Sequence, residues 1–302
     1  MVQIGVLSKS REYFPTTKLL EEMDNRKNLS GVFLSTQYVS PLISNNSSDA
    51  IFADQSLKPL AGVIPRIGRS QTQIGLTYLK QFELMGIPTT LTAKALFLAR
   101  DKFRCYQALK GISNLKIPKT LLINNSYIIE KVLTHFKFPI VIKIPNATRG
   151  TGTILATSRR VAHEVIDALF LRYDSPIMVQ EYLRNTSSSK NTFSQDIRVL
   201  VVGRSLLGAM RRIAPQGEWR TNYAQGAECV SYKPTSDEQE LTMKIIDKIS
   251  IEIAGIDLFP TEDGVYVLEV NACPGWKAFE SANPDISVAK KIIDYIETKI
   301  RK

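Results

Sequence analysis

Two oxygen-bearing side chains near the end of the chain have the spacing of a cation site. Glu269 and Asn271 are two residues apart in the apolar stretch 265–271. Successive side chains of a strand alternate between faces, so both leave the same face. Asp257, within residues 255–258, offers a third oxygen donor, and oxygen donors suit Mg²⁺ held together with substrate phosphates. We expect Asp257, Glu269 and Asn271 to bind a metal, although a carboxylate on a solvated edge strand is the alternative.

A second group of residues suits phosphate. Lys143 interrupts the apolar stretch 138–144, and the small polar loop 148–153 with Arg149 and two glycines follows it. Glycine lets several backbone N–H groups turn to one side, as a bound phosphate requires. A buried ammonium is costly unless it is paired or meets an anion, so Lys143 and Lys102 are candidates for nucleotide phosphates. The alternatives are a simple glycine hairpin and lysines that reach the surface.

Arginines gather in the middle of the chain: Arg198, Arg204, Arg211, Arg212 and Arg220. Asp196 and Arg198 share one face of a predicted strand, whereas Arg211 and Arg212 face opposite ways, so only one of the latter can point into a site. Guanidinium groups bind carboxylates and phosphates through two hydrogen bonds. A solvated face or a nucleic-acid patch would also be basic, but few aromatic residues are interleaved here.

The elements that must position these residues fall into two parts. In the first, short apolar stretches at 2–7, 31–35 and 61–65 alternate with helical patterns at 16–23 and 74–84. Strands alternating with helices predict a parallel sheet with both faces covered. No G-x-G-x-x-G motif occurs, so nothing beyond topology favours a dinucleotide site.

The rest of the chain has the pattern of antiparallel strands with flanking helices. We expect one long helix over 92–109 and another over 235–254. Predicted strands cover residues 138–144, 177–183, 196–202, 205–212 and 265–270. The fold class is therefore α/β (α+β), a parallel-sheet part followed by antiparallel sheets.

Composition places the chain among globular proteins. It has 302 residues, of which 44% are hydrophobic and 23% charged. No stretch of about 18 consecutive apolar residues occurs, and the first residues lack a signal-peptide pattern, so we expect a cytoplasmic protein without a membrane span. Three widely spaced cysteines predict reduced thiols, and two histidines leave little room for zinc or histidine-based catalysis.

The net charge of +10 is unevenly distributed. Residues 1–139 carry a net +9, residues 140–233 carry +6, and residues 234–302 carry −5. The positive middle coincides with the predicted phosphate loop and the arginines, and the negative end contains the predicted metal ligands. This distribution indicates that anions and cations are bound by different parts of the chain, although solubility alone also requires surface charge.

Several motifs occur together and in a fixed order. They are GVIPRIG (62–68), LKQFELMG (79–86), DKFRCYQAL (101–109), FPIVIKIPNATRGTGTIL (138–155), VQEYL (179–183), SQDIRVLVVG (194–203), MRRIAPQGEWRTNYAQG (210–226), AGIDLF (254–259) and LEVNACPGWKAFE (268–280). Together they resemble the ATP-grasp superfamily, and within it the RimK-type α-L-glutamate ligases. The resemblance implies an ATP-grasp fold with an N-terminal pre-ATP-grasp domain (1–95), a central lid subdomain (96–180) and a C-terminal subdomain with the metal ligands (181–302).

The resemblance also implies roles for individual residues. ATP would be bound by Lys102, Lys143, the glycine-rich lid residues Arg149, Gly150, Thr151 and Gly152, the adenine hinge Gln180, Glu181, Tyr182 and Leu183, and by Asp196. Mg²⁺, as two ions with Mn²⁺ as a substitute, would be bound by Asp257, Glu269 and Asn271. Arg211, with Arg198 as second candidate, would act on the transferred phosphoryl group. Arg220 and Asn222 would bind the amino-acid substrate.

The family's chemistry is a carboxylate–amine ligation. An acceptor carboxylate takes the γ-phosphate of ATP to give an acyl phosphate, and the amine of L-glutamate then displaces phosphate. The implied acceptor is a peptide or ribosomal-protein C-terminus or a coenzyme glutamyl tail, and the implied assembly is a homo-oligomer such as a tetramer. Alternatives are an ATP-grasp ligase of lysine or other amino-acid biosynthesis, a catalytically inactive ATP-binding scaffold, and a basic nucleic-acid-binding protein.

Three stretches depart from the family pattern. The loop before Asp196 is longer than usual, the stretch after Asn222 is less basic, and Trp276 begins a bulkier stretch than the family's smaller, more acidic one. All three lie where the acceptor should bind, so they leave the identity of the acceptor open.

Overall fold

Three parallel strands form the first sheet, as the alternation of strands and helices predicts. The computed structural model describes residues 1–144, 152–173, 175–184, 194–221 and 226–301. The strand order is β2-β1-β6, and α2 covers one face while α1 packs on the other. The elements are β1 (Val2–Ser8), α1 (Phe14–Asp24), β2 (Leu29–Ser35), β6 (Gly62–Arg66) and α2 (Thr72–Leu84). With both faces covered, the strands are largely apolar.

A small antiparallel sheet and a short 3₁₀ turn complete this part. Between β2 and β6 the chain forms a sheet of order β3-β4-β5, and a single 3₁₀ turn, η1, follows β6. Their bounds are β3 (Ser40–Ile43), β4 (Ser48–Phe52), β5 (Gln55–Ser56) and η1 (Arg69–Gln71).

The helix predicted over 92–109 is broken into two, so that prediction is wrong. The helices are α3 (Ala93–Arg100) and α4 (Lys102–Leu109). Asp101 between them has an extended backbone, and its carboxylate accepts a hydrogen bond from the Arg104 amide at 2.9 Å. Aspartate favours this N-cap position over a helix interior. The break sets the start of α4, where Lys102 is the first residue.

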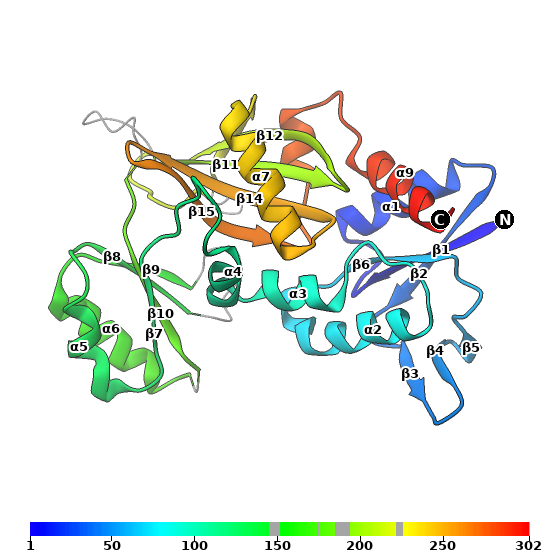
Figure 1. Ribbon diagram of the computed structural model, residues 1–302, viewed down its shortest axis with the longest axis horizontal. Coiled ribbons are helices and arrows are strands. Elements are labelled where there is room, and N and C mark those ends of the chain that lie inside the picture. The colour runs from blue at the N-terminus through cyan, green and yellow to red at the C-terminus, as the bar shows by residue number, and fades with distance from the viewer. Residues whose placement is uncertain (145–151, 174, 185–193, 222–225, 302) are drawn as a thin grey trace.

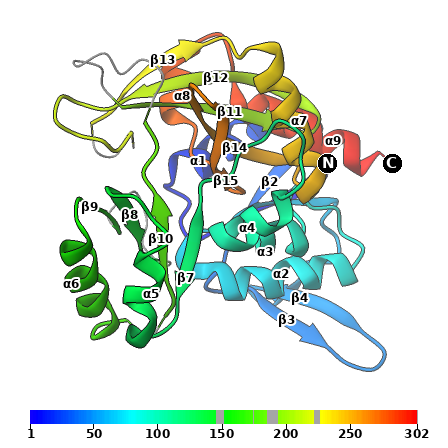
Figure 2. The ribbon, with the colours of Figure 1, turned by 60° about the vertical axis from the view of Figure 1, so that its left-hand side comes forward.

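The middle of the chain forms a separate lobe, seen on the left of Figure 1 and again apart from the rest in Figure 2. Its sheet has the order β7-β10-β8-β9 with all neighbours antiparallel, and α5 and α6 cover one face. The elements are β7 (Thr120–Ile123), η2 (Ser126–Ile128), α5 (Ile129–Leu133), β8 (Ile140–Lys143), β9 (Thr153–Ala156), α6 (Arg159–Phe170) and β10 (Ile177–Glu181).

A five-stranded antiparallel sheet forms the third part. Its order is β13-β12-β11-β14-β15, and α7 packs on one face. The elements are β11 (Gln195–Val202), β12 (Ser205–Ile213), β13 (Glu228–Tyr232), α7 (Ser236–Ile249), β14 (Ile253–Thr261) and β15 (Gly264–Asn271). Helix α7 ends earlier than predicted because Ser250 takes the left-handed conformation, with φ of 58°, and residues 253–254 then belong to β14. The predicted fold class is confirmed.

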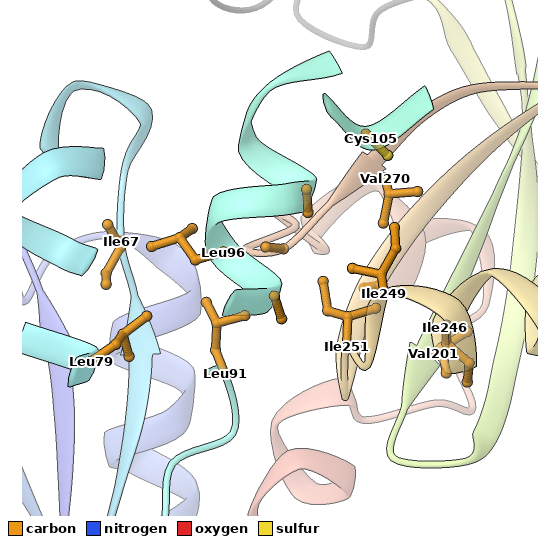
Figure 3. Packing of buried hydrophobic residues seen from close by; sticks show 14 of the residues in the cluster. Ile67, Leu79, Leu91, Leu96, Cys105, Val201, Ile246, Ile249, Ile251 and Val270 are labelled. Carbon is orange, nitrogen blue, oxygen red and sulfur yellow. The ribbon is translucent and has the colours of Figure 1, made fainter. Parts of the chain in front are cut away.

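The end of the chain returns to the first sheet. Helices α8 (Lys277–Ala282) and α9 (Val288–Ile300) follow β15, and α9 packs beside α1 on that sheet. On the other face of the first sheet, one apolar cluster joins the first part to the five-stranded sheet, with Ile67 and Leu79 at one end and Val201 and Ile246 at the other (Figure 3). The first and third parts therefore share two cores, whereas the lobe has its own.

Two further expectations from composition can be compared with the fold. No helix in the described part of the chain is long and apolar enough to cross a membrane. The three cysteines are free thiols, as predicted. Burial raises the pKa of the Cys105 thiol to about 12, which keeps that group protonated.

Candidate active site

An extra residue in β15 determines where Glu269 points. Asp257 pairs with Glu269 and Leu258 pairs with Val267, so Leu268 is a β-bulge without a partner residue. Before the bulge Val267 faces the core, and after it Val270 does. Glu269 and Asn271 therefore leave the opposite face, as the i, i+2 spacing predicts. Bulges commonly redirect side chains in this way beside active sites.

The three predicted metal ligands lie together on this face. Asp257 is directly opposite Glu269, and Asn271 is opposite Gly255, two pairs further along the ladder. Directly opposite residues of an antiparallel pair have Cβ atoms about 4.5–5.5 Å apart. The Asn271 Oδ1 accepts a hydrogen bond from the Cys273 amide at 3.0 Å, which orients its side chain.

Each of the two carboxylates has a cationic partner. The Lys102 ammonium donates a short hydrogen bond to Glu269. Burial would raise the pKa of Glu269, but the charge of Lys102 outweighs it and the pKa lies below its usual value. The predicted phosphate lysine and the predicted metal ligand are thus in direct contact.

Asp257 belongs to a buried network of four alternating charges. Arg198 donates two hydrogen bonds to its carboxylate, at 2.6 and 2.7 Å. Arg212 bridges the two aspartates, with a 2.7 Å bond to Asp257 and two 2.6 Å bonds to Asp196. Although burial would raise the pKa of Asp257, the two arginines bring it well below its usual range. The network holds Asp257 ionised in a fixed position.

The register of β12 corrects the expectation for Arg211. Arg211 and Arg212 do face opposite ways, but Arg212 is the one on the face of Asp257, and Arg211 lies on the other face. The Arg211 guanidinium stacks on the Tyr232 ring at 4.7 Å. The reason is a bulge at Leu207, since Val201 pairs with Leu206 and Leu200 pairs with Gly208. Without that extra residue, Arg211 would be opposite Asp196.

A chain of hydrogen bonds connects the lobe to β15. Lys143 on β8 donates to the Gln180 side-chain oxygen. The Gln180 amide donates to the Tyr106 hydroxyl at 3.2 Å, and this hydroxyl donates to the Leu268 carbonyl at 2.8 Å. Burial lowers the pKa of Lys143 to about 7, and the nearby charge of Lys102 adds to this effect. Lys143 is therefore a lysine that can change charge near neutral pH.

The predicted adenine hinge lies at the end of β10. The Gln180 side chain is buried against Lys143, and its amide also donates to Thr120 at 2.8 Å. The Glu181 carboxylate accepts from the Lys119 amide at 2.7 Å, and Tyr182 meets the Trp219 ring edge to face at 6.2 Å. Leu183 is partly buried at the exit from the strand. These contacts place the hinge residues at the connection between the lobe and the five-stranded sheet.

The predicted lid and substrate residues lie partly outside the described residues. Arg149, Gly150, Thr151 and Asn222 are among those outside. Gly152 is buried, and its carbonyl accepts from the Ile144 amide at 2.8 Å, which begins the β8–β9 hairpin. Arg220 pairs with Glu218 at 2.7 Å and lowers the pKa of that carboxylate to about 2.

Sequence reasoning missed three residues of this region. They are Arg212 at the centre of the charge network, and Tyr106 and Thr120 around Gln180. The sequence contains a signal for Arg212, because one of two adjacent arginines must share a face with Asp196. In a hairpin without a bulge, however, that arginine would be Arg211. Nothing in the sequence links Tyr106 to Gln180.

No group of three or more histidine, cysteine, aspartate or glutamate side chains that could hold a metal occurs within the described residues. The predicted set has two carboxylates and one amide instead. Hard cations such as Mg²⁺ accept such a set, and they commonly take further ligands from substrate phosphates and water. The donor chemistry and the shared face therefore fit magnesium.

Two domain families match the chain along almost its whole length. The RimK-like ATP-grasp domain matches residues 99–296, and the RimK PreATP-grasp domain matches residues 2–96. A protein of Maridesulfovibrio salexigens named "Probable alpha-L-glutamate ligase" is 32% identical over 299 residues, covering 98% of this chain and 95% of its own. A protein of Trichodesmium erythraeum with the same name is 31% identical over 302 residues, covering 100% and 98%.

Solved structures show the same fold. The ATP-grasp ligase PsnB complexed with minimal precursor has a TM-score of 0.75 at 16% identity, covering 99% of this chain and 100% of its own. Macrocyclase MdnC bound with precursor peptide MdnA from Microcystis aeruginosa has a TM-score of 0.73 at 15% identity, covering 98% and 100%. D-alanyl-alanine synthetase A from Vibrio cholerae has a TM-score of 0.73 at 16% identity, covering 100% and 99%.

Proposed function

The chain belongs to the RimK-like ATP-grasp family of ATP-dependent ligases, and we propose that it adds L-glutamate to a carboxylate-bearing acceptor through an acyl phosphate. The observation that carries this proposal is the pair of facing carboxylates, Asp257 and Glu269, beside the cations Lys102 and Lys143. A bound nucleoside triphosphate requires both oxygen ligands for its metal ion and ammonium groups for its phosphates, and this site has the two side by side.

ATP and Mg²⁺ are the expected co-substrate and cofactor of this family, and PsnB has been solved with magnesium and ADP. We propose that Asp257, Glu269 and Asn271 would hold the metal, as two ions. When bound, the metal neutralises charge on the phosphates and makes phosphoryl transfer easier.

The cations of the site divide into those that bind substrate and one that supports the site. Lys102 and Lys143 bind the phosphates, with Lys143 oriented by Gln180. The Arg198 side chain is 16% exposed and can reach a transferring phosphoryl group, whereas that of Arg212 is 3% exposed and holds Asp257 in place. We therefore assign to Arg198 the role that the sequence pattern suggests for Arg211.

The proposed reaction needs no nucleophile from the protein. The acceptor carboxylate itself attacks the γ-phosphorus of ATP, and ADP leaves. The glutamate amine, after losing a proton, attacks the acyl carbon and expels phosphate. The protonated thiol of Cys105 agrees with this scheme, since a buried cysteine with a raised pKa is not a nucleophile.

The acceptor that we propose is a peptide carboxylate. Two structural neighbours, PsnB and MdnC, were solved with precursor peptides. The positive net charge of residues 1–139 suits an acidic peptide, because opposite charge steers association.

The test is product analysis with labelled glutamate. Purified protein is incubated with ATP, MgCl₂, labelled L-glutamate and either tri-L-glutamate or a cell extract, and mass spectrometry identifies the molecule that gains mass. We expect ADP and phosphate in amounts equal to the amide formed, and a hydroxamate of the acceptor when hydroxylamine is added. AMP and pyrophosphate as products would overturn the acyl-phosphate scheme. Label on a coenzyme tail alone would overturn the peptide acceptor.

A further inference from the structure

The carboxyl ends of the first sheet place an arginine beside the active site. Ser8 at the end of β1 is opposite Ser35 on β2 and Arg66 on β6, so three strands end at one level. In open α/β sheets, ligands bind outside the carboxyl ends of the strands. The catalytic scheme above assigns no role to this edge.

Arg66 is a partly exposed cation without an acidic partner. Its guanidinium donates to the Pro274 carbonyl at 2.5 Å and stacks on the Trp276 ring at 4.7 Å. Within the described residues neither Arg66 nor Arg100 forms an ion pair with a carboxylate. Burial lowers the pKa of Arg66, and the charge of Arg100 lowers it further. Two neighbouring cations without a counter-charge favour binding of an anion.

Three buried polar atoms without a partner in the described part of the chain belong to residues along this same edge of the sheet. Among the described residues, the buried side-chain nitrogen or oxygen atoms that lack a hydrogen-bond partner are Gln71 Oε1, Arg100 Nε and Trp276 Nε1. The Trp276 ring lies under the Arg66 guanidinium. A terminal guanidinium nitrogen of Arg100 donates to the Ile67 carbonyl at 2.7 Å, and Gln71 is the last residue of η1. Buried polar groups are normally paired, so this concentration needs an explanation. The two nitrogens are donors and the oxygen is an acceptor.

Open space adjoins this group on two sides. A Cβ atom at Gly68 or at Gly275 would meet nothing within 4 Å. Any residue can adopt the backbone conformation of Gly68, which has φ of −70° and ψ of 160°. A side chain introduced at Gly68 would therefore fill the space without straining the fold.

The group is also next to the charge network. A Cβ at Gly255 would lie 3.0 Å from Pro274 and 3.7 Å from the Arg198 side chain. Pro274 accepts the hydrogen bond of Arg66, and Arg198 holds Asp257. A ligand held by Arg66 would thus lie beside the predicted metal ligands.

We propose that Arg66, Arg100 and Trp276 form a subsite for a substrate carboxylate, with Gln71 accepting a hydrogen bond from an N–H group next to that carboxylate. This subsite rests on the proposed ligase function and names the part of a substrate that it binds. The carboxylate with an adjacent N–H occurs both in free L-glutamate and at the C-terminal residue of an acidic peptide. Arg66, the stacked and partly exposed cation, is the residue that the ligand meets first.

Trp276 provides a direct reporter of binding. The chain has two tryptophans, so Trp219→Phe leaves Trp276 as the only one. In this background we expect L-glutamate or tri-L-glutamate to change the Trp276 fluorescence with saturation, without ATP. Arg66→Gln should weaken that binding about tenfold or more, the loss expected for a charge-assisted hydrogen bond. Gly68→Leu should weaken it as well, because the added side chain fills the space that the ligand needs. Arg204→Gln, which removes an exposed arginine that pairs with Asp247 on α7, is the matched control.

Steady-state kinetics of the otherwise unaltered chain separate the two substrates. A raised KM for L-glutamate alone assigns the subsite to the incoming amino acid, and a raised KM for tri-L-glutamate alone assigns it to the acceptor. In both cases the KM for ATP should stay within about twofold, which also shows that the variants are folded. Unchanged affinity for both ligands in Arg66→Gln and in Gly68→Leu would overturn the subsite. Absence of glutamate-dependent ADP release by the wild type would overturn the ligase proposal instead, whatever the fluorescence shows.

Discussion

Asp257 lies directly opposite Glu269 only because Leu268 is an extra residue in β15. In an unbulged hairpin Asp257 would be opposite Leu268, and Glu269 would face the apolar core. The same device acts in β12, where the extra residue Leu207 brings Arg212 rather than Arg211 opposite Asp196. Two single-residue bulges therefore decide which charged side chains meet at the site.

The first prediction concerns Glu269. Glu269→Gln should lower kcat/KM by at least about 100-fold, because the amide removes a charged metal ligand and the partner of Lys102. The measurement is ADP release at saturating magnesium. Glu262→Gln, an exposed glutamate in the turn of the same hairpin, should keep its activity. Activity near the wild-type rate in Glu269→Gln would show that the metal lies elsewhere.

The second prediction compares two adjacent arginines. Arg212→Met leaves the buried carboxylates of Asp196 and Asp257 without their shared partner, and should lower the free energy of unfolding by about 3–5 kcal/mol. Arg211→Met loses its contact with Tyr232, whose stacking part is worth about 0.5–2 kcal/mol, and leaves no buried carboxylate unpaired. Urea denaturation followed by circular dichroism measures both. Equal losses would mean that the network does not hold the sheet as described.

Parts of this site that depend on local spacing are predictable from the sequence, whereas parts that depend on strand register are not. The i, i+2 spacing of Glu269 and Asn271 was sufficient, because alternation over two residues does not depend on a partner strand. The choice between Arg211 and Arg212 depends on register, which a bulge at Leu207 changes. Gly208, with φ of 156°, is a local signal of this bulge, since glycine inside a strand often marks one, but it does not say which register results. The break at Asp101 is not determined by the sequence alone, because aspartate occurs within helices as well as at the N-cap. The return of α9 to the first sheet depends on contacts more than 200 residues apart, as in the hydrogen bonds from Arg26 to Asp294 and Glu297.

The third prediction is a pH dependence of nucleotide binding. Lys143 has a pKa of about 7 in the free protein, and a bound phosphate should raise it. Below about pH 7 the ammonium is already present, whereas above it binding must take up a proton, so affinity should fall by up to tenfold per pH unit from about pH 7 to about pH 9. Calorimetry at about pH 8 in two buffers of different ionisation enthalpy measures the proton uptake.

Lys143→Arg is the control for this titration. Arginine stays protonated throughout this range, so the variant should bind ATP with little pH dependence. The same proton uptake in Lys143→Arg would assign it to another group.

The fourth prediction concerns the hydrogen-bond chain between the lobe and β15. Tyr106→Phe leaves the Leu268 carbonyl without its side-chain donor and removes one partner of Gln180, at a cost of about 1–3 kcal/mol. The midpoint of urea unfolding should fall accordingly. Tyr127→Phe, which changes a fully exposed tyrosine, should leave the midpoint where it is. A wild-type midpoint for Tyr106→Phe would show that the hydroxyl does not connect the two parts.

The position of α9 has a consequence for the order in which the protein forms during synthesis. The first sheet is made early, but one of its faces is covered partly by Ile292, Ile293 and Ile296 from the last helix. Domains usually fold as they leave the ribosome, with N-terminal parts first. Here the strands of the first sheet keep an apolar surface exposed to solvent and chaperones until α9, which lies more than 200 residues after β6, has emerged. Completion of the first sheet therefore waits for a segment that is synthesised long after its own strands.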